Sequence, residues 1–258
     1  MAGDDAVVRR LGRLVPDVDH PFDPRRTMDY RVDASPDGTL VVFEEGDVLV
    51  ETDDHTAAAD AVYVRMYRRA FELASLAGWV RLHAVTADVD GRRVLVVGPS
   101  GVGKTTLALA LLAAGHRVDG DESVLVRDGQ SLAVPRGFHV KAGAEGHVDA
   151  HGDAIRAAPL VGDVRVVDPH ALAPDWRLDI ARVDDVVVLG EPGSTSVRVE
   201  AVDRPAVLQT LVAESFVVTE SKSDLVQALA TLSAGATARR ISRGPVDDLV
   251  HAVAGRAG

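Results

Sequence analysis

The sequence predicts an α/β protein whose central β-sheet is mixed rather than wholly parallel. Hairpin signals lie on both sides of a glycine-rich loop that joins an apolar strand to a helix. Strands also outnumber helices in the middle of the chain, whereas a strict alternation of strand and helix would build a parallel sheet. With 47% apolar and 26% charged residues, the composition is ordinary for a globular protein with a sizeable core. We expect a main domain at residues 79–258 and a small N-terminal α+β extension at residues 1–78.

The extension is predicted to open with a charged arm and a β-meander. Residues 1–28 are charged and contain proline, with a possible short helix near Val7–Leu14, and we expect this arm to pack poorly. Residues 30–51 alternate polar and apolar side chains around two turns, which is typical of a small antiparallel meander.

A helix is predicted to close the extension at residues 57–77. Asp53 or Asp54 stands where an N-cap residue is expected. Helical spacing gives this helix an apolar face made of Val62, Met66, Ala70 and Leu73.

Two hairpins frame the glycine-rich loop of the main domain. The first joins β-rich runs at residues 79–88 and 92–98 through an Asp-Val-Asp-Gly turn, and the second, at residues 123–134, turns at Asp128-Gly129. Residues 141–162 are rich in Gly, Ala, His and Asp and are expected to form a long loop. Further strands are expected at 164–167, 186–189 and 197–200, and helices at 203–213, 222–234 and 246–254.

The loop from Gly98 to Thr105 reads GPSGVGKT and satisfies the Walker A pattern in full. Glycines let the backbone wrap around phosphate oxygens, and the following helix aims the positive end of its dipole at the same anion. Lys104 is expected to reach the β- and γ-phosphates, and Thr105 to place its hydroxyl on magnesium. We therefore predict binding of ATP with magnesium. The expected nucleotide-contacting residues are Gly98, Pro99, Ser100, Gly101, Val102, Gly103, Lys104, Thr105 and Thr106.

Transfer of a phosphoryl group also needs a second metal ligand and a base, and Asp121 and Glu122 are the best candidates. Adjacent acids on an extended segment point to opposite sides, so one can hold the metal while the other meets the acceptor. A solvated turn is the alternative interpretation of this acidic run.

Three further residues are weaker candidates. His83 lies on the strand before the first hairpin, and a structural histidine is the alternative. Arg136 and Lys141 can stabilise charge on the transferred phosphoryl group or hold an acidic acceptor, and solvated basic residues are the alternative.

The 141–162 segment offers one more hypothesis. His147, Asp149, His151 and Asp153 alternate, so on an extended segment they would present four metal-capable side chains on one face. A flexible loop, or a lid that folds over the acceptor, is the alternative.

The run Leu82-His83-Ala84, followed by GPSGVGKTTLALALLAAGHRVDGDE, resembles the catalytic core of HPr kinase/phosphorylase and its wider relatives. The resemblance is specific over residues 79–126. It implies the P-loop kinase fold shared with ATP-dependent phosphoenolpyruvate carboxykinase. It also implies that Asp121 and Thr105 stand at the magnesium, that Asp121 or Glu122 activates the acceptor hydroxyl, and that His83 lies near the γ-phosphate.

The chain departs from that family in three ways. Glu122 stands where the family has aspartate, and the glycine-rich signature segment has no clear counterpart after Val134. In place of the family's large N-terminal domain, we expect only the small extension described above. The layout fits the smaller HPr-kinase-like proteins, and relatives of HPr kinase often assemble as homo-oligomers.

These observations predict an ATP- and magnesium-dependent kinase that uses Lys104, His83, Asp121 and Glu122. Its acceptor is expected to be a hydroxyl, such as a serine of a peptide or protein. An ATPase or ATP-gated binding module is one alternative, and a phosphotransferase acting on free serine or a small carboxylic acid is another.

The composition excludes several other classes. The formal charge of −11 argues against nucleic acid or an anionic membrane as a partner, because both carry the same sign. The chain has no cysteine, which excludes disulfides and thiol catalysis. We find no secretory signal or membrane span and expect a cytoplasmic protein.

Overall fold

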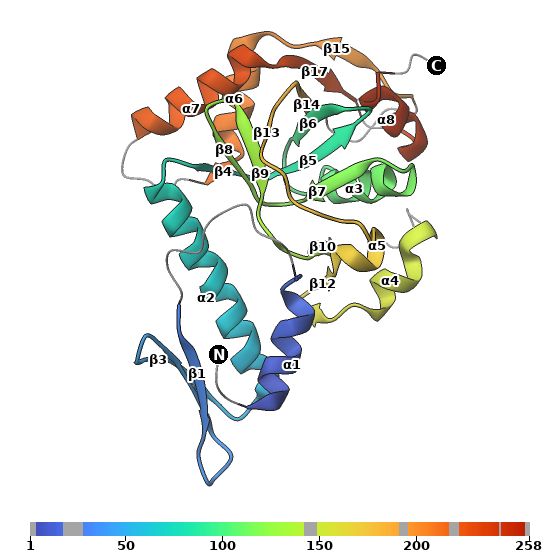
Figure 1. Ribbon diagram of the computed structural model, residues 1–258. Helices are drawn as coiled ribbons and strands as arrows, with labels where there is room; N and C mark the ends of the chain where they lie inside the picture. The colour runs from blue at the N-terminus through green and yellow to red at the C-terminus, as the bar shows by residue number, and fades with distance from the viewer. Residues whose placement is uncertain are drawn as a thin grey trace.

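The computed structural model describes residues 4–17, 28–141, 149–190, 196–216, 222–242 and 244–255. It is a mixed α/β structure with several β-sheets, as the sequence predicts. Figure 1 shows most strands and helices gathered in one body, from which a long helix and the N-terminal meander project. Among the described residues, no helix is long and apolar enough to cross a membrane.

The projecting part is formed by the N-terminal meander and two helices. Its strands pair antiparallel in the order β1-β2-β3, which confirms the predicted meander. Asp54 caps α2 by accepting a hydrogen bond from the Thr56 amide. The elements are α1 (Asp5–Leu14), β1 (Tyr30–Ala34), β2 (Leu40–Glu44), β3 (Asp47–Thr52) and α2 (His55–Leu76).

Two expectations for this part are wrong. The described part of the arm packs well, because Val7, Leu11 and Leu14 of α1 are buried against α2 and its neighbours. The predicted apolar face of α2 is wrong in part: Val62 is buried as expected and Met66 packs against the core, but Ala70 is exposed, whereas Tyr63 and two other aromatic residues of α2 are buried. The aromatic rings contribute more apolar area than the alanine, so they determine which face is buried.

A six-stranded sheet with the order β15-β17-β14-β6-β5-β7 forms the centre of the body. β14 pairs parallel with both β6 and β17, while β5 pairs antiparallel with β6 and β7, so the sheet is mixed. Its elements and the flanking helix are β5 (Ala84–Val89), β6 (Arg92–Val97), α3 (Lys104–Ala113), β7 (Arg117–Gly120), β14 (Asp185–Leu189), β15 (Val199–Ala201) and β17 (Thr237–Ile241).

An antiparallel five-stranded sheet with the order β13-β9-β8-β4-β16 lies beside the six-stranded sheet, and a three-stranded sheet has the order β10-β12-β11. Both predicted hairpins are confirmed, with Asp90-Gly91 and Asp128-Gly129 in the left-handed conformation that such tight turns need. The strands are β4 (Val80–Leu82), β8 (Val124–Arg127), β9 (Gln130–Ala133), β10 (Phe138–Lys141), β11 (Leu160–Val161), β12 (Val164–Val167), β13 (Ala181–Arg182) and β16 (Ser215–Phe216).

The two faces of the six-stranded sheet are covered differently. Val94 and Val96 of β6 pack with α3 and α8, while Leu95 and Val97 pack with α6, α7 and the five-stranded sheet. Both faces of β6 are therefore buried, which explains its unbroken apolar sequence. The three predicted C-terminal helices are confirmed as α6 (Arg204–Ala213), α7 (Lys222–Gly235) and α8 (Val246–Val253).

The segment after β10 is more ordered than its composition suggests. The expected long loop contains a short 3-10 helix, a helix and a strand over residues 149–161, and Ile155 is fully buried there. The helices are η2 (Asp149–His151), α4 (Gly152–Ala157) and α5 (Pro169–Leu172). One buried isoleucine among small residues anchors the helix, a signal too weak to read from composition.

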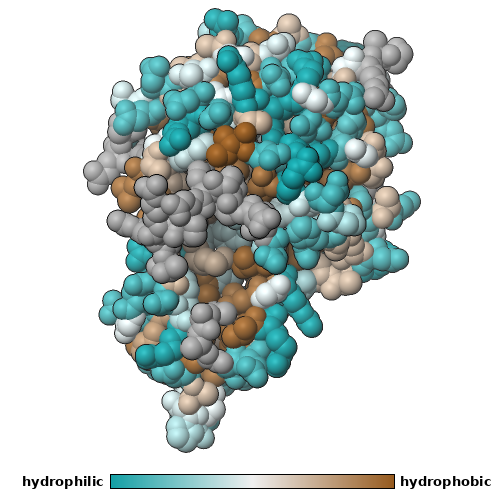
Figure 2. Space-filling view, viewed as in Figure 1, coloured by the Kyte–Doolittle hydropathy of each residue, from teal (hydrophilic) through white to brown (hydrophobic). Residues whose placement is uncertain are grey.

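The N-terminal helices share one hydrophobic cluster with residues of the main body. Phe71 of α2 belongs to it, as do Leu125, Leu132 and Trp176. Figure 2 shows hydrophobic atoms gathered in the hollow between the projecting part and the body, while the body above it is mostly hydrophilic. The division of the chain at residue 78 stays a prediction.

A buried ion pair fixes the strand that leads to the acid pair. Asp119 of β7 is fully buried and accepts a hydrogen bond of 2.6 Å from Arg93 of β6. Its backbone carbonyl accepts a second bond from the Trp176 indole at 3.0 Å. Removing one partner would leave a buried charge uncompensated, so this pair holds the end of β7 in place.

Candidate active site

The glycine-rich loop runs from the end of β6 to the start of α3. Gly98, Gly101 and Gly103 have φ angles of 152°, 80° and 102°. Gly103 is the N-cap of α3 and no side chain caps that helix, so the amides of its first turn are available to an anion. A Cβ atom on Gly98 would lie 2.7 Å from the Leu189 carbonyl oxygen, so only glycine fits between the loop and β14.

Gly98→Ala is therefore expected to lower the free energy of unfolding by about 2–4 kcal/mol, because it combines backbone strain with a contact to a fixed carbonyl. Urea denaturation would measure the change. Gly12→Ala is the matched control: a Cβ there meets nothing within 4 Å, and alanine should stabilise α1 by up to about 1 kcal/mol. Equal stabilities for the Gly98 variant and the wild type would contradict the close approach of the loop to β14.

Lys104 begins α3 and its side chain is buried. Its ammonium donates hydrogen bonds to the carbonyl oxygens of Gly98 and, at 3.1 Å, Pro99. Burial lowers the pKa of Lys104, while Glu214 and the acid pair oppose that shift. The ammonium thus lies inside the loop beside three carboxylates.

His83 lies between β4 and β5, where the chain crosses from the five-stranded to the six-stranded sheet. Its Nδ1 is 3.3 Å from a Glu214 carboxylate oxygen and 3.5 Å from the Lys104 ammonium. Burial, with the charges of Lys104, Arg81 and Lys141, lowers the pKa of His83 to about 4. The imidazole beside the loop is therefore neutral at pH 7.

Asp121 follows β7 and is 5% exposed. One carboxylate oxygen accepts a hydrogen bond of 2.9 Å from the Thr105 hydroxyl. Burial, together with the neighbouring Glu122, raises the pKa of Asp121 to about 7, while the bond from Thr105 opposes the shift. The loop hydroxyl and this carboxylate are thus in direct contact.

Glu122 does not lie on an extended segment. The prediction that the side chains of Asp121 and Glu122 point to opposite sides because of strand alternation is therefore wrong in its reason. Glu122 has a left-handed φ of 61° and forms the turn between β7 and β8. Its carboxylate is 3.4 Å from Nδ1 of His139 and 3.8 Å from the Arg136 guanidinium. The turn, rather than strand alternation, separates the two acids.

The other residues predicted for the site differ in how far they are exposed. Pro99, Ser100 and Gly101 are exposed at the tip of the loop, and Thr106 is half-buried in α3. The Val102 side chain packs into the core, so only its backbone can face a ligand. Lys141 is exposed at the end of β10.

Three residues of this site were missed in the sequence. Glu214 caps the end of α6, far along the chain, and no sequence signal points to it. Arg81 lies on β4, two residues before His83, so alternation along the strand predicted there could have indicated it. Its guanidinium lies over the Phe71 and Phe216 rings and donates to the Ser123 hydroxyl. His139 lies between Arg136 and Lys141 and is buried.

The alternating His and Asp residues after β10 do not share an extended face. Asp149 and His151 belong to a 3-10 helix and Asp153 to α4, while His147 lies outside the described residues. Within the described ranges, no group of three metal-ligating side chains is found.

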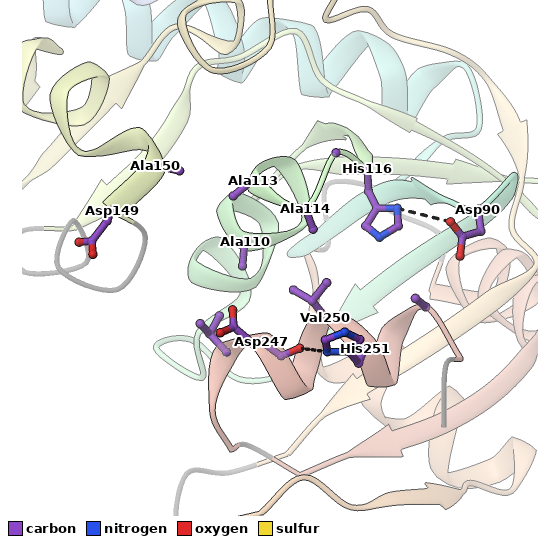
Figure 3. A pocket seen from close by; sticks show the side chains of 13 residues that line it. Asp90, Ala110, Ala113, Ala114, His116, Asp149, Ala150, Asp247, Val250 and His251 are labelled. Carbon is purple, nitrogen blue, oxygen red and sulfur yellow. Dashed lines mark hydrogen bonds and ion pairs between the residues drawn. The ribbon is translucent and has the colours of Figure 1, made fainter. Parts of the chain in front are cut away.

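A cavity of 720 Å³ lies away from the loop site. It lies at the opposite end of α3, between that helix, α8 and Asp149 (Figure 3). His116 there is paired with Asp90 at 3.8 Å, and Nδ1 of His251 lies 2.8 Å from the Asp247 carbonyl oxygen. We place the candidate active site at the loop, because the acids and Lys104 meet there.

The chain is similar to known proteins over part of its length. It is 32% identical over 96 residues to HPr kinase/phosphorylase of Lachnoclostridium phytofermentans, which covers 37% of this chain and 29% of that protein. The enzyme of the same name from Clostridium botulinum is 41% identical over 59 residues, covering 23% of this chain and 19% of the relative. This chain is a distant, partial homologue of HPr kinase/phosphorylase. No family model matches it.

The matched segments span less than a third of the curated relatives' length. Among solved structures, Hpr(Ser) kinase/phosphatase from Coxiella burnetii matches with 17% identity and a TM-score of 0.34, covering 68% of this chain and 92% of that one. The HPr kinase homology agrees with the resemblance in the loop and acid-pair sequence.

Proposed function

We propose that this protein is an ATP- and magnesium-dependent kinase that transfers the γ-phosphoryl group to a hydroxyl. The hydrogen bond between Thr105 and Asp121 carries the proposal, because it joins the loop hydroxyl to a buried carboxylate beside Lys104. Homology to a protein named as a kinase supports the same activity. The proposal includes a P-loop kinase fold, ATP as the nucleotide and magnesium as the metal.

The residues at the loop fit a magnesium ion. Mg²⁺ takes hard oxygen ligands and uses one or two protein groups, with phosphate oxygens and waters completing its shell. Thr105 and Asp121 present a hydroxyl and a carboxylate oxygen 2.9 Å apart, so both can reach one ion. Bound magnesium would neutralise charge on the β- and γ-phosphates.

Each protein group then has a role in transfer. The loop amides and Lys104 bind the phosphate oxygens, and neutral His83 lines the site without adding a second positive charge. The acceptor oxygen forms a bond to the γ-phosphorus while the bond from that phosphorus to the bridging oxygen breaks and ADP leaves. The hydroxyl proton passes to a carboxylate of the Asp121–Glu122 pair.

For the acceptor, we propose a serine of a peptide or protein, because the homologues are named for phosphorylating a protein. Incubation with γ-labelled ATP, magnesium and a panel of serine peptides, HPr and free serine tests this. Label on a peptide or protein supports the proposal. Label on free serine alone indicates a small-molecule kinase, and release of labelled phosphate to water alone indicates an ATPase.

A further inference from the structure

A tyrosine of the N-terminal helix α2 reaches the acid pair through His139. Tyr63 is 1% exposed, and its hydroxyl oxygen lies 3.0 Å from Nε2 of His139. Tyr63 precedes residue 79, where the sequence resemblance begins. A residue outside the glycine-rich loop segment therefore touches the site.

The chemistry of the partners indicates the hydrogen-bond directions. Arg136 can only donate, so its Nε, 3.2 Å away, donates to the Tyr63 hydroxyl oxygen. The phenolic hydrogen is then available for Nε2 of His139. An imidazole that accepts at Nε2 and is neutral carries its proton on Nδ1. The ring is buried and its Nδ1 lies 3.2 Å from the Arg136 guanidinium, which disfavours a second positive charge on His139.

His139 lies beside both acids of the pair. Its backbone amide is close enough to Asp121 to lower the pKa of that carboxyl group, against the larger opposite effect of burial. Its Nδ1 lies 3.4 Å from the Glu122 carboxylate, so a proton on Nδ1 gives Glu122 a donor. Arg136 competes for the same ring: its Nη2, 3.2 Å from Nδ1, can only donate, so this contact favours the other tautomer, in which Nδ1 accepts and Glu122 faces a lone pair. A Tyr63 hydroxyl that donates to Nε2 opposes that preference.

We propose that Tyr63 is a positioning residue for phosphoryl transfer, because its hydroxyl selects the Nδ1–H tautomer of His139 and thereby fixes Glu122 beside Asp121. The effect of Tyr63 on the rate of transfer rests on the kinase proposed above, whereas its effect on the His139 tautomer does not. This role makes the N-terminal helix part of the active site.

Tyr63→Phe is the test, with Tyr67→Phe as the matched control. Tyr67 lies one turn further along α2 and donates to the Pro135 carbonyl oxygen rather than to His139. Nitrogen-15 NMR of the two His139 ring nitrogens reports the tautomer directly. We expect the wild type and Tyr67→Phe to show a protonated Nδ1, and Tyr63→Phe to shift the proton towards Nε2.

Kinetics provide the second readout. We expect Tyr63→Phe to lower kcat about 10-fold, as is usual for a group that orients an active-site ligand, with KM for ATP changed less than about twofold. An unchanged tautomer in Tyr63→Phe would overturn the inference. If the wild type transferred phosphate to no acceptor, the proposed kinase would fail, while the NMR result would still decide the role of Tyr63.

A pair of His139 substitutions tests the same idea without altering α2. The amide nitrogen of asparagine can take the place of Nδ1, whereas that of glutamine takes the place of Nε2. We therefore expect His139→Asn to keep about 10-fold more activity than His139→Gln. Equal activities in the two variants, or the reverse order, would count against a donor to Glu122.

Discussion

Lys104→Ala is expected to weaken ATP binding by about 100-fold, which is about 3 kcal/mol, because the ammonium is the only full charge that the glycine-rich loop itself contributes. The loop amides remain, so residual binding is expected at high nucleotide concentration. Titration calorimetry with ATP and magnesium measures the effect.

Lys222→Ala is the control for that experiment. Lys222 is exposed at the start of α7, so its removal changes the net charge equally without touching the loop. A dissociation constant for Lys104→Ala within about threefold of the control would contradict a phosphate-binding role for the loop.

Asp121→Asn is expected to lower the rate of phosphoryl transfer by at least about 100-fold while sparing ATP binding. The amide oxygen can still accept from Thr105, so the local geometry is kept, but the negative charge needed for metal and proton is lost. Single-turnover transfer assays and calorimetry separate the two effects. Transfer at the wild-type rate would remove Asp121 from the site.

The same substitution is expected to stabilise the protein without nucleotide or magnesium. Because folding raises the pKa of Asp121 from 3.8 to about 7, its contribution to stability is fully present below pH 3.8 and is lost as pH rises to 7. Asparagine does not titrate, so the variant gains up to about 4 kcal/mol relative to the wild type above pH 7, as an upper limit.

Thermal unfolding at several pH values measures this gain, which should grow between pH 4 and pH 7 and then level off. Glu44→Gln is the contrasting control: although burial opposes it, hydrogen bonds from Arg65 and Arg69 lower the pKa of Glu44, so removing its charge should destabilise the protein at pH 8. A lower melting temperature for Asp121→Asn than for the wild type at pH 8 would show that the charge of Asp121 is compensated in the folded protein.

The sequence alone predicted the elements whose signals are local. The glycine-rich loop, its strand and its helix are contiguous, and the hairpins follow from Asp-Gly turns whose residues tolerate positive φ. The sequence also predicted a mixed sheet, because hairpins join neighbouring antiparallel strands and their turn signals are local. It also located the acid pair, although the left-handed turn at Glu122 was not expected from its sequence.

Only the tertiary structure showed what surrounds these local motifs. Glu214 lies beside Lys104, and Tyr63 beside His139, through contacts between segments that are distant in the chain. Such contacts depend on how helices and sheets pack, which no short-range pattern records. The same reason explains α1: its three buried residues become a core only because α2 and the main body cover them.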